Sequence, residues 1–158
     1  MTDRYVAVED LRGLLRSEAR LIGLDLGEKT IGVAVSDVNH GLASPLVTLA
    51  RGKFGENAAQ LRAIFESEKA CAVVIGLPLN MDGSEGPRAQ ATRAFARNLA
   101  AAGAPPICLW DERWSTAAVQ RAMIDADVSR KRRAEAVDKL AAAFILQGAL
   151  DRMNFSRP

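Results

Sequence analysis

The sequence is poor in the residues that build disulfides, zinc sites and histidine-dependent active sites. It contains two cysteines and one histidine in 158 residues. Cys71 and Cys108 each lie in an apolar, strand-like run, and neither has a Cys or His at metal-ligand spacing. We therefore expect buried thiols instead of a disulfide or a zinc site. His40 lies in a turn-like Asn-His-Gly stretch with no acid or nucleophile pattern around it, which argues against a catalytic histidine.

Long hydrophobic runs are also missing. Arg12, Arg16 and Arg20 interrupt the first stretch that could be considered for a membrane span. The N-terminus lacks the basic-then-apolar order of a secretory signal. We therefore expect a cytoplasmic protein that does not associate with a membrane. The length suits one domain with its own core.

Charge is nearly balanced, with a formal net charge of +2. The distribution of the cations is more informative, because four of them follow Ser129 without interruption: Arg130, Lys131, Arg132 and Arg133. Such a run is either a solvated loop between helices or a contact surface for nucleic acid.

The first third of the chain predicts a short helix followed by three strands. Apolar residues at helical spacing indicate an amphipathic helix over residues 4–18. The run RLIGLDLG (20–27) ends at a glycine and predicts a buried strand, and KTIGVAVSD (29–37) alternates as a strand does. The short link between them predicts a hairpin, and a third strand is expected over 43–50.

The remaining chain alternates between helical and strand patterns. Helices are expected over 55–69, 87–103 and 134–153, with one more beginning at Ser115 or Thr116. Strands are expected over 71–76 and 106–110, the first of them apolar throughout, as a central strand should be. The order βββαβαβαα predicts an α/β fold with a mixed five-stranded sheet and helices on both faces. We expect a helical extension over residues 1–19, one domain over 20–153 and a tail over 154–158.

Three separated carboxylates draw attention as candidate site residues. Asp25 lies between Leu24 and Leu26 in an apolar strand, where a carboxylate is costly to bury unless it is paired or bound to a metal. Strand alternation could instead place Asp25 on an exposed face.

The second candidate is the pair Asp111 and Glu112, which follows the last predicted strand. Sites in α/β sheets form beyond the carboxyl ends of strands, and neighbouring residues of an extended chain point to opposite sides. We therefore expect one of the two acids to enter a site. Arg113 could pair with a carboxylate or with a phosphate, and a salt-bridged strand end is the simpler alternative.

The third candidate is Asp138 in the last predicted helix. Helical spacing places it on one face with Ala141, Ala142, Ile145 and Ala149. An acid on a stripe of small apolar residues is unusual, unless it lies in the first turn and is stabilised by the helix dipole.

Three carboxylates in one site would repel one another, and a divalent cation removes that repulsion. Oxygen ligands select Mg²⁺ or Mn²⁺, and two such ions support phosphodiester cleavage when substrate is bound. Two loops suit a phosphate substrate: the turn with Lys29 directly after Asp25, and the glycine-rich loop over 76–86 with Asn80, which precedes a helix N-terminus.

Four motifs resemble one known family when taken together and in order: LDLGEKTIGVAVSD, VIGLPLNMDGSEG, DERWST and the stretch from Asp138 to Gln147. They are similar to the YqgF/RuvX family of pre-16S rRNA nucleases and Holliday junction resolvase-like proteins. The resemblance implies an RNase H-like fold and a hydrolase that trims the 5′ end of 16S rRNA in ribosome biogenesis. By motif, it implies Asp25, Glu112 and Asp138 as catalytic and metal-binding residues, and it selects Glu112 over Asp111.

Nucleic-acid contacts are expected from Lys29, Asn80, Arg113, Arg130, Lys131, Arg132 and Arg133. Thr30 follows Lys29 where the family often has arginine, so an arginine contact from that turn is in doubt. Trp114 stands where a smaller aliphatic residue is common.

Several alternatives stay open. Actin-like ATPases and sugar kinases share the D-x-G hairpin but are much longer. A non-catalytic RNA-binding or transcription-associated factor could keep the fold. The partner is either pre-rRNA, on the ribosomal small subunit, or branched DNA. Junction resolution normally requires a symmetric dimer, whereas the sequence defines no dimer face, so a monomer or weak homodimer is expected.

Overall fold

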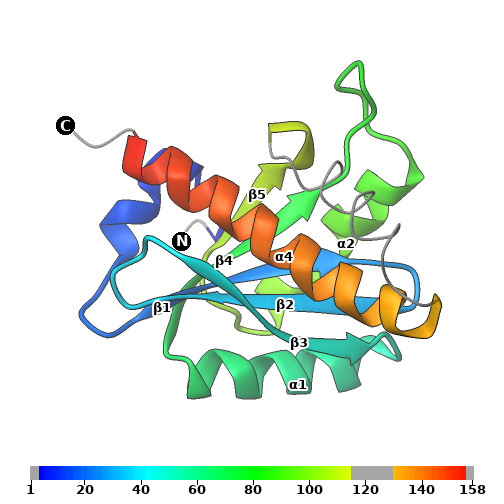
Figure 1. Ribbon diagram of the computed structural model, residues 1–158, viewed down its shortest axis with the longest axis horizontal. Helices are drawn as coiled ribbons and strands as arrows, with labels where there is room; N and C mark the ends of the chain where they lie inside the picture. Colours follow the sequence, from blue (N-terminus) through cyan, green and yellow to red (C-terminus); the bar gives the residue numbers. More distant parts are fainter. Residues whose placement is uncertain (1–3, 115–129, 156–158) are drawn as a thin grey trace.

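The computed structural model describes the chain over residues 4–114 and 130–155, and its side chains over 4–113 and 139–155. The centre of the fold is a five-stranded sheet with the strand order β3-β2-β1-β4-β5 (Figure 1). The strands are β1 (Arg20–Leu26), β2 (Thr30–Ser36), β3 (Ala43–Ala50), β4 (Ala70–Leu77) and β5 (Ile107–Asp111). β1, β2 and β3 pair antiparallel, whereas β4 pairs parallel with both β1 and β5. The predicted mixed sheet is confirmed.

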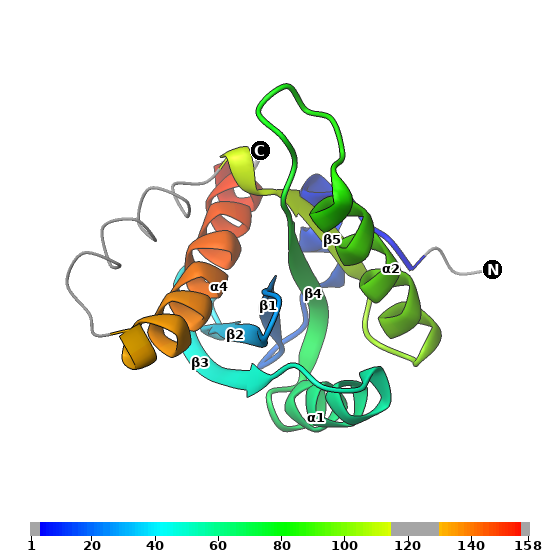
Figure 2. The same cartoon turned by 90° about the vertical axis from the view of Figure 1, so that its right-hand side faces the viewer.

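Helices cover both faces of this sheet (Figure 2). α1 (Phe54–Ser67) and α2 (Pro87–Ala101) lie on one face, where their side chains pack with Ile22, Leu24 and Ile75. α4 (Arg130–Phe155) lies on the other face, together with the 3-10 helix η1 (Val8–Leu14). Neighbouring residues of β1 therefore belong to different cores, as the two-residue period of a strand requires.

The predicted helices and strands appear with ends shifted by a few residues, apart from two larger differences. The N-terminal helix is a 3-10 helix over Val8–Leu14 and does not span residues 4–18. The physical reason is that residues 4–6 are extended against the edge of β5, where Val6 N donates to Ile107 O at 2.9 Å and Ile107 N donates to Arg4 O at 2.7 Å.

The second difference concerns the basic run. α4 begins at Arg130 and not at about residue 134, so these four cations belong to a helix instead of a loop. Lysine and arginine are good helix formers, which allows the helix to extend through them. A further helix, predicted to begin at Ser115 or Thr116, lies outside the described residues.

The two cysteines and the single histidine have structural roles in the fold. Both cysteines are buried free thiols, as predicted, and burial raises the pKa of Cys108 to about 12. His40 has a positive φ of 60° in the β2–β3 turn, and its Nε2 lies 2.8 Å from Ala19 O. It therefore holds a turn to the start of β1. Within the described ranges, we find no helix with the length and hydrophobicity needed to cross a membrane.

Candidate active site

The carboxyl ends of β1, β4 and β5 meet at one end of the sheet, because these three strands are parallel. We call this end of the sheet the active edge. Asp25 is the last residue but one of β1. Glu112 follows directly after β5, in the short 3-10 helix η2 (Glu112–Trp114). The glycine-rich loop begins where β4 ends, at Leu77. Ligand sites in α/β sheets form at such an edge.

Asp25 belongs to the side of the sheet that α4 covers. A Cβ built on Gly23 would lie 2.7 Å from Leu146 Cβ, so position 23 faces α4. Asp25 is two residues further along the same strand and so faces the same way. The residue is only 2% exposed. The alternative of an exposed strand face is therefore wrong for Asp25, and a buried carboxylate requires a partner or a cation.

Glu112 reaches the same side of the sheet over β4. A Cβ built on Gly76 would lie 2.6 Å from Glu112 Oε1 and 2.5 Å from Ile145 Cδ1. Only glycine at residue 76 therefore leaves room for this carboxylate in its present position. Leu24 pairs with Ile75, so Asp25 and Gly76 are the next residues on neighbouring strands, which are about 4.8 Å apart. The Glu112 carboxylate thus lies over the strand beside Asp25.

The first part of α4 lies toward the same edge of the sheet (Figure 1). Asn154, near the end of α4, donates to His40 O at 3.0 Å, beside the start of β1. Ala142 O lies against Gly23, in the middle of β1. α4 therefore runs antiparallel to β1, and residue 138, about one turn before Ala142, is displaced toward the Asp25 end.

The expected apolar stripe of α4 is confirmed, since Ala141, Ala142, Ile145 and Ala149 are all buried. Asp138 is the ninth residue of the helix, so stabilisation in a first turn does not account for it. Its side chain lies outside the described ones. The convergence of all three carboxylates therefore stays a prediction.

Asp111 has a different role from Glu112. Arg113 forms a bidentate ion pair with Asp111. Its Nη2 donates to Oδ2 at 2.7 Å, and its Nε lies 3.1 Å from both carboxylate oxygens. These hydrogen bonds hold the pKa of the Asp111 carboxyl below its usual value and raise the pKa of Arg113. Of the two alternatives for this segment, a site acid or a salt-bridged strand end, the salt-bridged strand end therefore applies to Asp111.

Arg113 also holds the glycine-rich loop. Its Nη1 donates to Met81 O at 3.2 Å, and its guanidinium packs against Gly83, whose φ is +88°. Asn80 organises the loop from within, because its Nδ2 donates to Ser84 Oγ at 2.9 Å and its backbone N donates to Ser84 O at 2.9 Å. The described contacts of Asn80 and Arg113 are thus structural, and their binding of nucleic acid stays a prediction.

Arg51 is a cation near the site that the sequence patterns did not single out. Its Nη1 donates to Gly27 O at 2.6 Å, in the turn behind Asp25, and its backbone N donates to Lys29 O at 2.8 Å. Its guanidinium carbon lies 5.6 Å from the centre of the Phe95 ring. The pairing of Thr30 with Ala50 carries the next residue, Arg51, to this turn. Lys29 itself is exposed.

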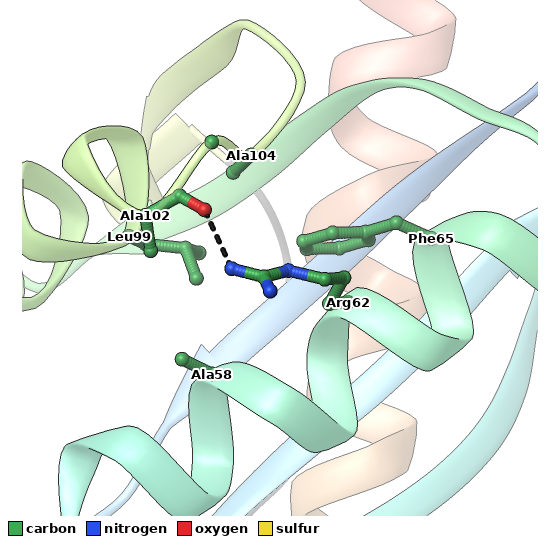
Figure 3. A pocket seen from close by; sticks show the side chains of 7 residues that line it. Ala58, Arg62, Phe65, Leu99, Ala102 and Ala104 are labelled. Carbon is green, nitrogen blue, oxygen red and sulfur yellow. Dashed lines mark hydrogen bonds between the residues drawn. The ribbon is translucent and has the colours of Figure 1, made fainter.

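A small cavity between α1 and the end of α2 is not a substrate site (Figure 3). It has a volume of about 20 Å³, enough for roughly one water molecule. Arg62 Nη2 donates to Ala102 O at 2.8 Å there and so satisfies a carbonyl at the C-terminal end of α2 (Figure 3). The cavity lies on the α1/α2 face of the sheet, away from Asp25 and Glu112.

Among the described side chains, no three acids, histidines or cysteines lie close enough to hold a metal ion. Asp25 and Glu112 offer only carboxylate oxygens, which suit a hard divalent cation and not zinc. His40 is held at the opposite end of β1, by Ala19. The chemistry of these two carboxylates therefore fits a hard divalent cation.

Comparisons with known proteins concern the family and the fold of this chain. A protein of Cereibacter sphaeroides named "Putative pre-16S rRNA nuclease" is 57% identical over 96% of this chain and 94% of its own length. A protein of Methylocella silvestris with the same name is 56% identical over 97% of this chain and 95% of its own. Among solved structures, Thermus thermophilus RuvC in complex with Holliday junction substrate matches with a TM-score of 0.53 and 15% identity.

That structural match covers 89% of this chain and 99% of the RuvC chain. At this identity the likeness concerns the fold alone, and the fold is RNase H-like, as the motifs implied. The model of the family described as "RuvX: Holliday junction resolvase" matches residues 19–152, which include all three candidate carboxylates. With this match over most of the chain, and with relatives more than half identical, the chain belongs to the RuvX family.

Proposed function

We propose that this protein is a divalent-metal-dependent endonuclease that hydrolyses RNA phosphodiester bonds and processes the 5′ end of pre-16S rRNA. The observation that carries the proposal is the position of two carboxylates on one side of the sheet. Asp25 is buried on β1, and Glu112 reaches over Gly76 on the neighbouring strand. Relatives of more than 50% identity are named for pre-16S rRNA, which supports RNA as the substrate.

Asp25, Glu112 and Asp138 would hold Mg²⁺ or Mn²⁺, and two ions when substrate is bound. Such ions lower the pKa of a bound water and neutralise the charge that develops on the phosphate. The chain itself supplies the positioning. β1 fixes Asp25, Gly76 admits Glu112, and Arg51 holds the turn that carries Lys29. Lys29 and Arg113 would orient the phosphates flanking the scissile bond.

The proposed partner is pre-rRNA, on the small ribosomal subunit, which places the protein in the cytoplasm. One active site per chain suffices for trimming an RNA end, so a monomer or weak homodimer is compatible with this substrate.

The decisive experiment is cleavage of a 5′-extended 16S rRNA fragment by wild type and by Asp25→Asn, with Mg²⁺, with Mn²⁺ and with chelator. Loss of one metal ligand should lower kcat by at least about a hundredfold, equal to roughly 2.7 kcal/mol. Asp151→Asn is the matched control, because Asp151 is exposed on the far end of α4. Equal residual cleavage by wild type and Asp25→Asn would show that the activity belongs to a contaminant.

A second candidate is resolution of branched DNA. It is favoured by the description of the family model and by the RuvC-like fold. The same variants should be assayed on a four-way DNA junction, beside a measurement of mass in solution. Junction cleavage by a dimer would favour this candidate. RNA binding without cleavage of either substrate would favour a non-catalytic RNA-binding factor.

A further inference from the structure

A concave site lies on the α1/α2 side of the sheet, beside the outermost strand β5. It has a volume of about 200 Å³ and is lined by Tyr5, Arg93, Arg97 and Leu109. Arg93 and Arg97 are one helical turn apart on α2 and therefore share a face. Tyr5 comes from the N-terminal segment that pairs with Ile107 at the start of β5. Three separate parts of the chain thus build the site.

The lining combines cations with an aromatic ring over an apolar residue. Tyr5 is 36% exposed, so its ring is accessible. Arg93 is paired with Glu85, with Nε at 2.5 Å from Oε1. Arg97 is exposed and forms no ion pair among the described side chains. Guanidinium groups bind phosphate, and aromatic rings stack on bases, which together describe a site for one nucleotide of a single strand.

The site is close to the proposed active centre. Leu109 precedes Glu112 by three residues, which is roughly 10 Å along an extended chain. Leu109 belongs to the α1/α2 side of the sheet, whereas Glu112 faces α4. β5 is the outermost of the five strands, and residues 4–6 lie along its outer side at Ile107. A nucleic-acid chain that contacts both faces must therefore pass the carboxyl end of β5.

The glycine-rich loop connects the two sites. Its Glu85 pairs with Arg93 at the concave site, and its Met81 carbonyl accepts from Arg113 beside Glu112. A chain passing around β5 would therefore follow this loop from one site to the other.

We propose that Tyr5, Arg93 and Arg97 form a subsite for one unpaired nucleotide of the RNA that flanks the cleaved bond. The base stacks on Tyr5, and the phosphate binds Arg97 and Arg93. This inference rests on the proposed function, because it names the path of that same substrate. A pocket of this size admits a single splayed nucleotide and not a duplex, so the subsite selects single-stranded flanks.

The test measures binding without cleavage, in the Asp25→Asn background, with fluorescent single-stranded RNAs of increasing length. Arg97→Ala and Tyr5→Leu should weaken binding of the longer RNAs by about fivefold or more, as expected for removing one stacked base or one bound phosphate. Arg97→Ala should also lower the salt slope by about 0.7. Tyr5→Phe should retain affinity because it keeps the ring.

Two controls make the result decisive. Arg152→Ala removes the same charge from α4, on the opposite side of the sheet, and should leave affinity unchanged. RNAs too short to reach β5 should bind all variants equally. Equal losses with short and long RNAs, or equal losses in Arg97→Ala and Arg152→Ala, would overturn the subsite. A length-dependent loss in a protein that never cleaves RNA would instead overturn only the proposed catalytic function.

Discussion

Gly76 and Gly23 both lie under α4, but an added methyl group would meet different neighbours at the two positions. At Gly76 it would meet the ends of two flexible side chains, Glu112 Oε1 and Ile145 Cδ1. At Gly23 it would meet Leu146 Cβ at 2.7 Å and the backbone oxygen of Ala142 at 3.0 Å. Side-chain ends can move aside, whereas the helix backbone moves only as a whole.

We therefore expect Gly76→Ala to displace Glu112 and lower kcat by at least tenfold, which is about 1.4 kcal/mol, with only a small change in Tm. Gly23→Ala should lower the free energy of unfolding by about 1–3 kcal/mol, as overpacking does. Thermal melts and cleavage rates of both variants test this contrast. A large loss of Tm in Gly76→Ala with unchanged kcat would contradict the assignment of Glu112.

Asp111 gives a prediction about pH. Hydrogen bonds from Arg113 hold the pKa of Asp111 below its usual value, so the folded state releases this proton more readily than the unfolded state. The pair therefore stabilises the fold above about pH 4, and that contribution is lost as pH falls through the lowered pKa. Asp111→Asn should lower the free energy of unfolding at neutral pH by up to about 1 kcal/mol, because the exposed Arg113 leaves the pair screened by solvent.

Chemical unfolding at pH 7 and at successively lower pH should show the difference between wild type and Asp111→Asn shrinking in acid. Ser67→Ala, an exposed change at the end of α1, is a control whose small effect should not depend on pH. A constant difference across this range would mean that the ion pair contributes nothing to stability.

At the residue scale, the sequence could identify Asp25 as an anomalous acid but could not assign it to a face. That assignment depends on the packing of Gly23 against Leu146, a contact between distant parts of the chain. The choice of Glu112 over Asp111 came from family resemblance, and the sequence patterns alone left it open. The structure accounts for this choice through Gly76 on β4, because the missing side chain of Gly76 leaves the space that Glu112 occupies.

At the element scale, the sequence patterns predict the five strands and the helices α1, α2 and α4, but not the short 3-10 helix η2 after β5. The patterns are clearest where an element buries a face, as β1 and β4 do. They are less successful where tertiary contacts override local preference. Residues 4–6 are extended because they pair with β5, although their spacing suited a helix. Periodicity predicts the start of α4 at about residue 134 and not at Arg130, since a run of cations has no apolar period that indicates a helix.

The glycine-rich loop leads to a prediction at the same scale. Asn80→Ala removes the bond from Asn80 Nδ2 to Ser84 Oγ and so loosens a loop beside the active edge. Because the loop is exposed, Tm should change little, whereas KM for RNA should rise several-fold, as expected for about 1 kcal/mol. Ala101→Ser, at an exposed position of α2, provides the control. A lower kcat with unchanged KM would indicate that Asn80 acts on the reacting groups and not on substrate binding.

At the scale of the whole molecule, the described cations frame the active edge from two sides. Arg51 and Lys29 lie at the turn after β1, and Arg113 lies after β5. α4 runs antiparallel to β1, so its first residues lie toward the same edge. The fold class and the direction of α4 relative to β1 follow from the order of the elements. The oligomeric state and the substrate depend on surfaces that hydrophobic periodicity does not identify.

The basic run at the start of α4 tests this arrangement. Residues 130–133 precede Asp138 by five to eight residues, which is roughly 8–12 Å along a helix. A variant in which all four cations are replaced by glutamine should bind single-stranded RNA more weakly. Its plot of log affinity against log salt should be shallower by up to about 0.7 for each phosphate that the variant no longer neutralises. With saturating RNA at low salt, kcat should be unchanged, because the metal ligands remain.

The matched control replaces four exposed or half-exposed cations elsewhere on the molecule and lowers the net charge by the same amount: Arg16, Arg62, Lys69 and Arg152. If binding depends only on total charge, both variants lose the same affinity and the same salt slope, and the run at 130–133 is an ordinary solvated surface. If the run binds the phosphates of a nucleic-acid chain, its variant alone shows the shallower slope. A larger loss for a four-way DNA junction than for single-stranded RNA would then favour branched DNA as the substrate, since a junction presents more phosphates near one site.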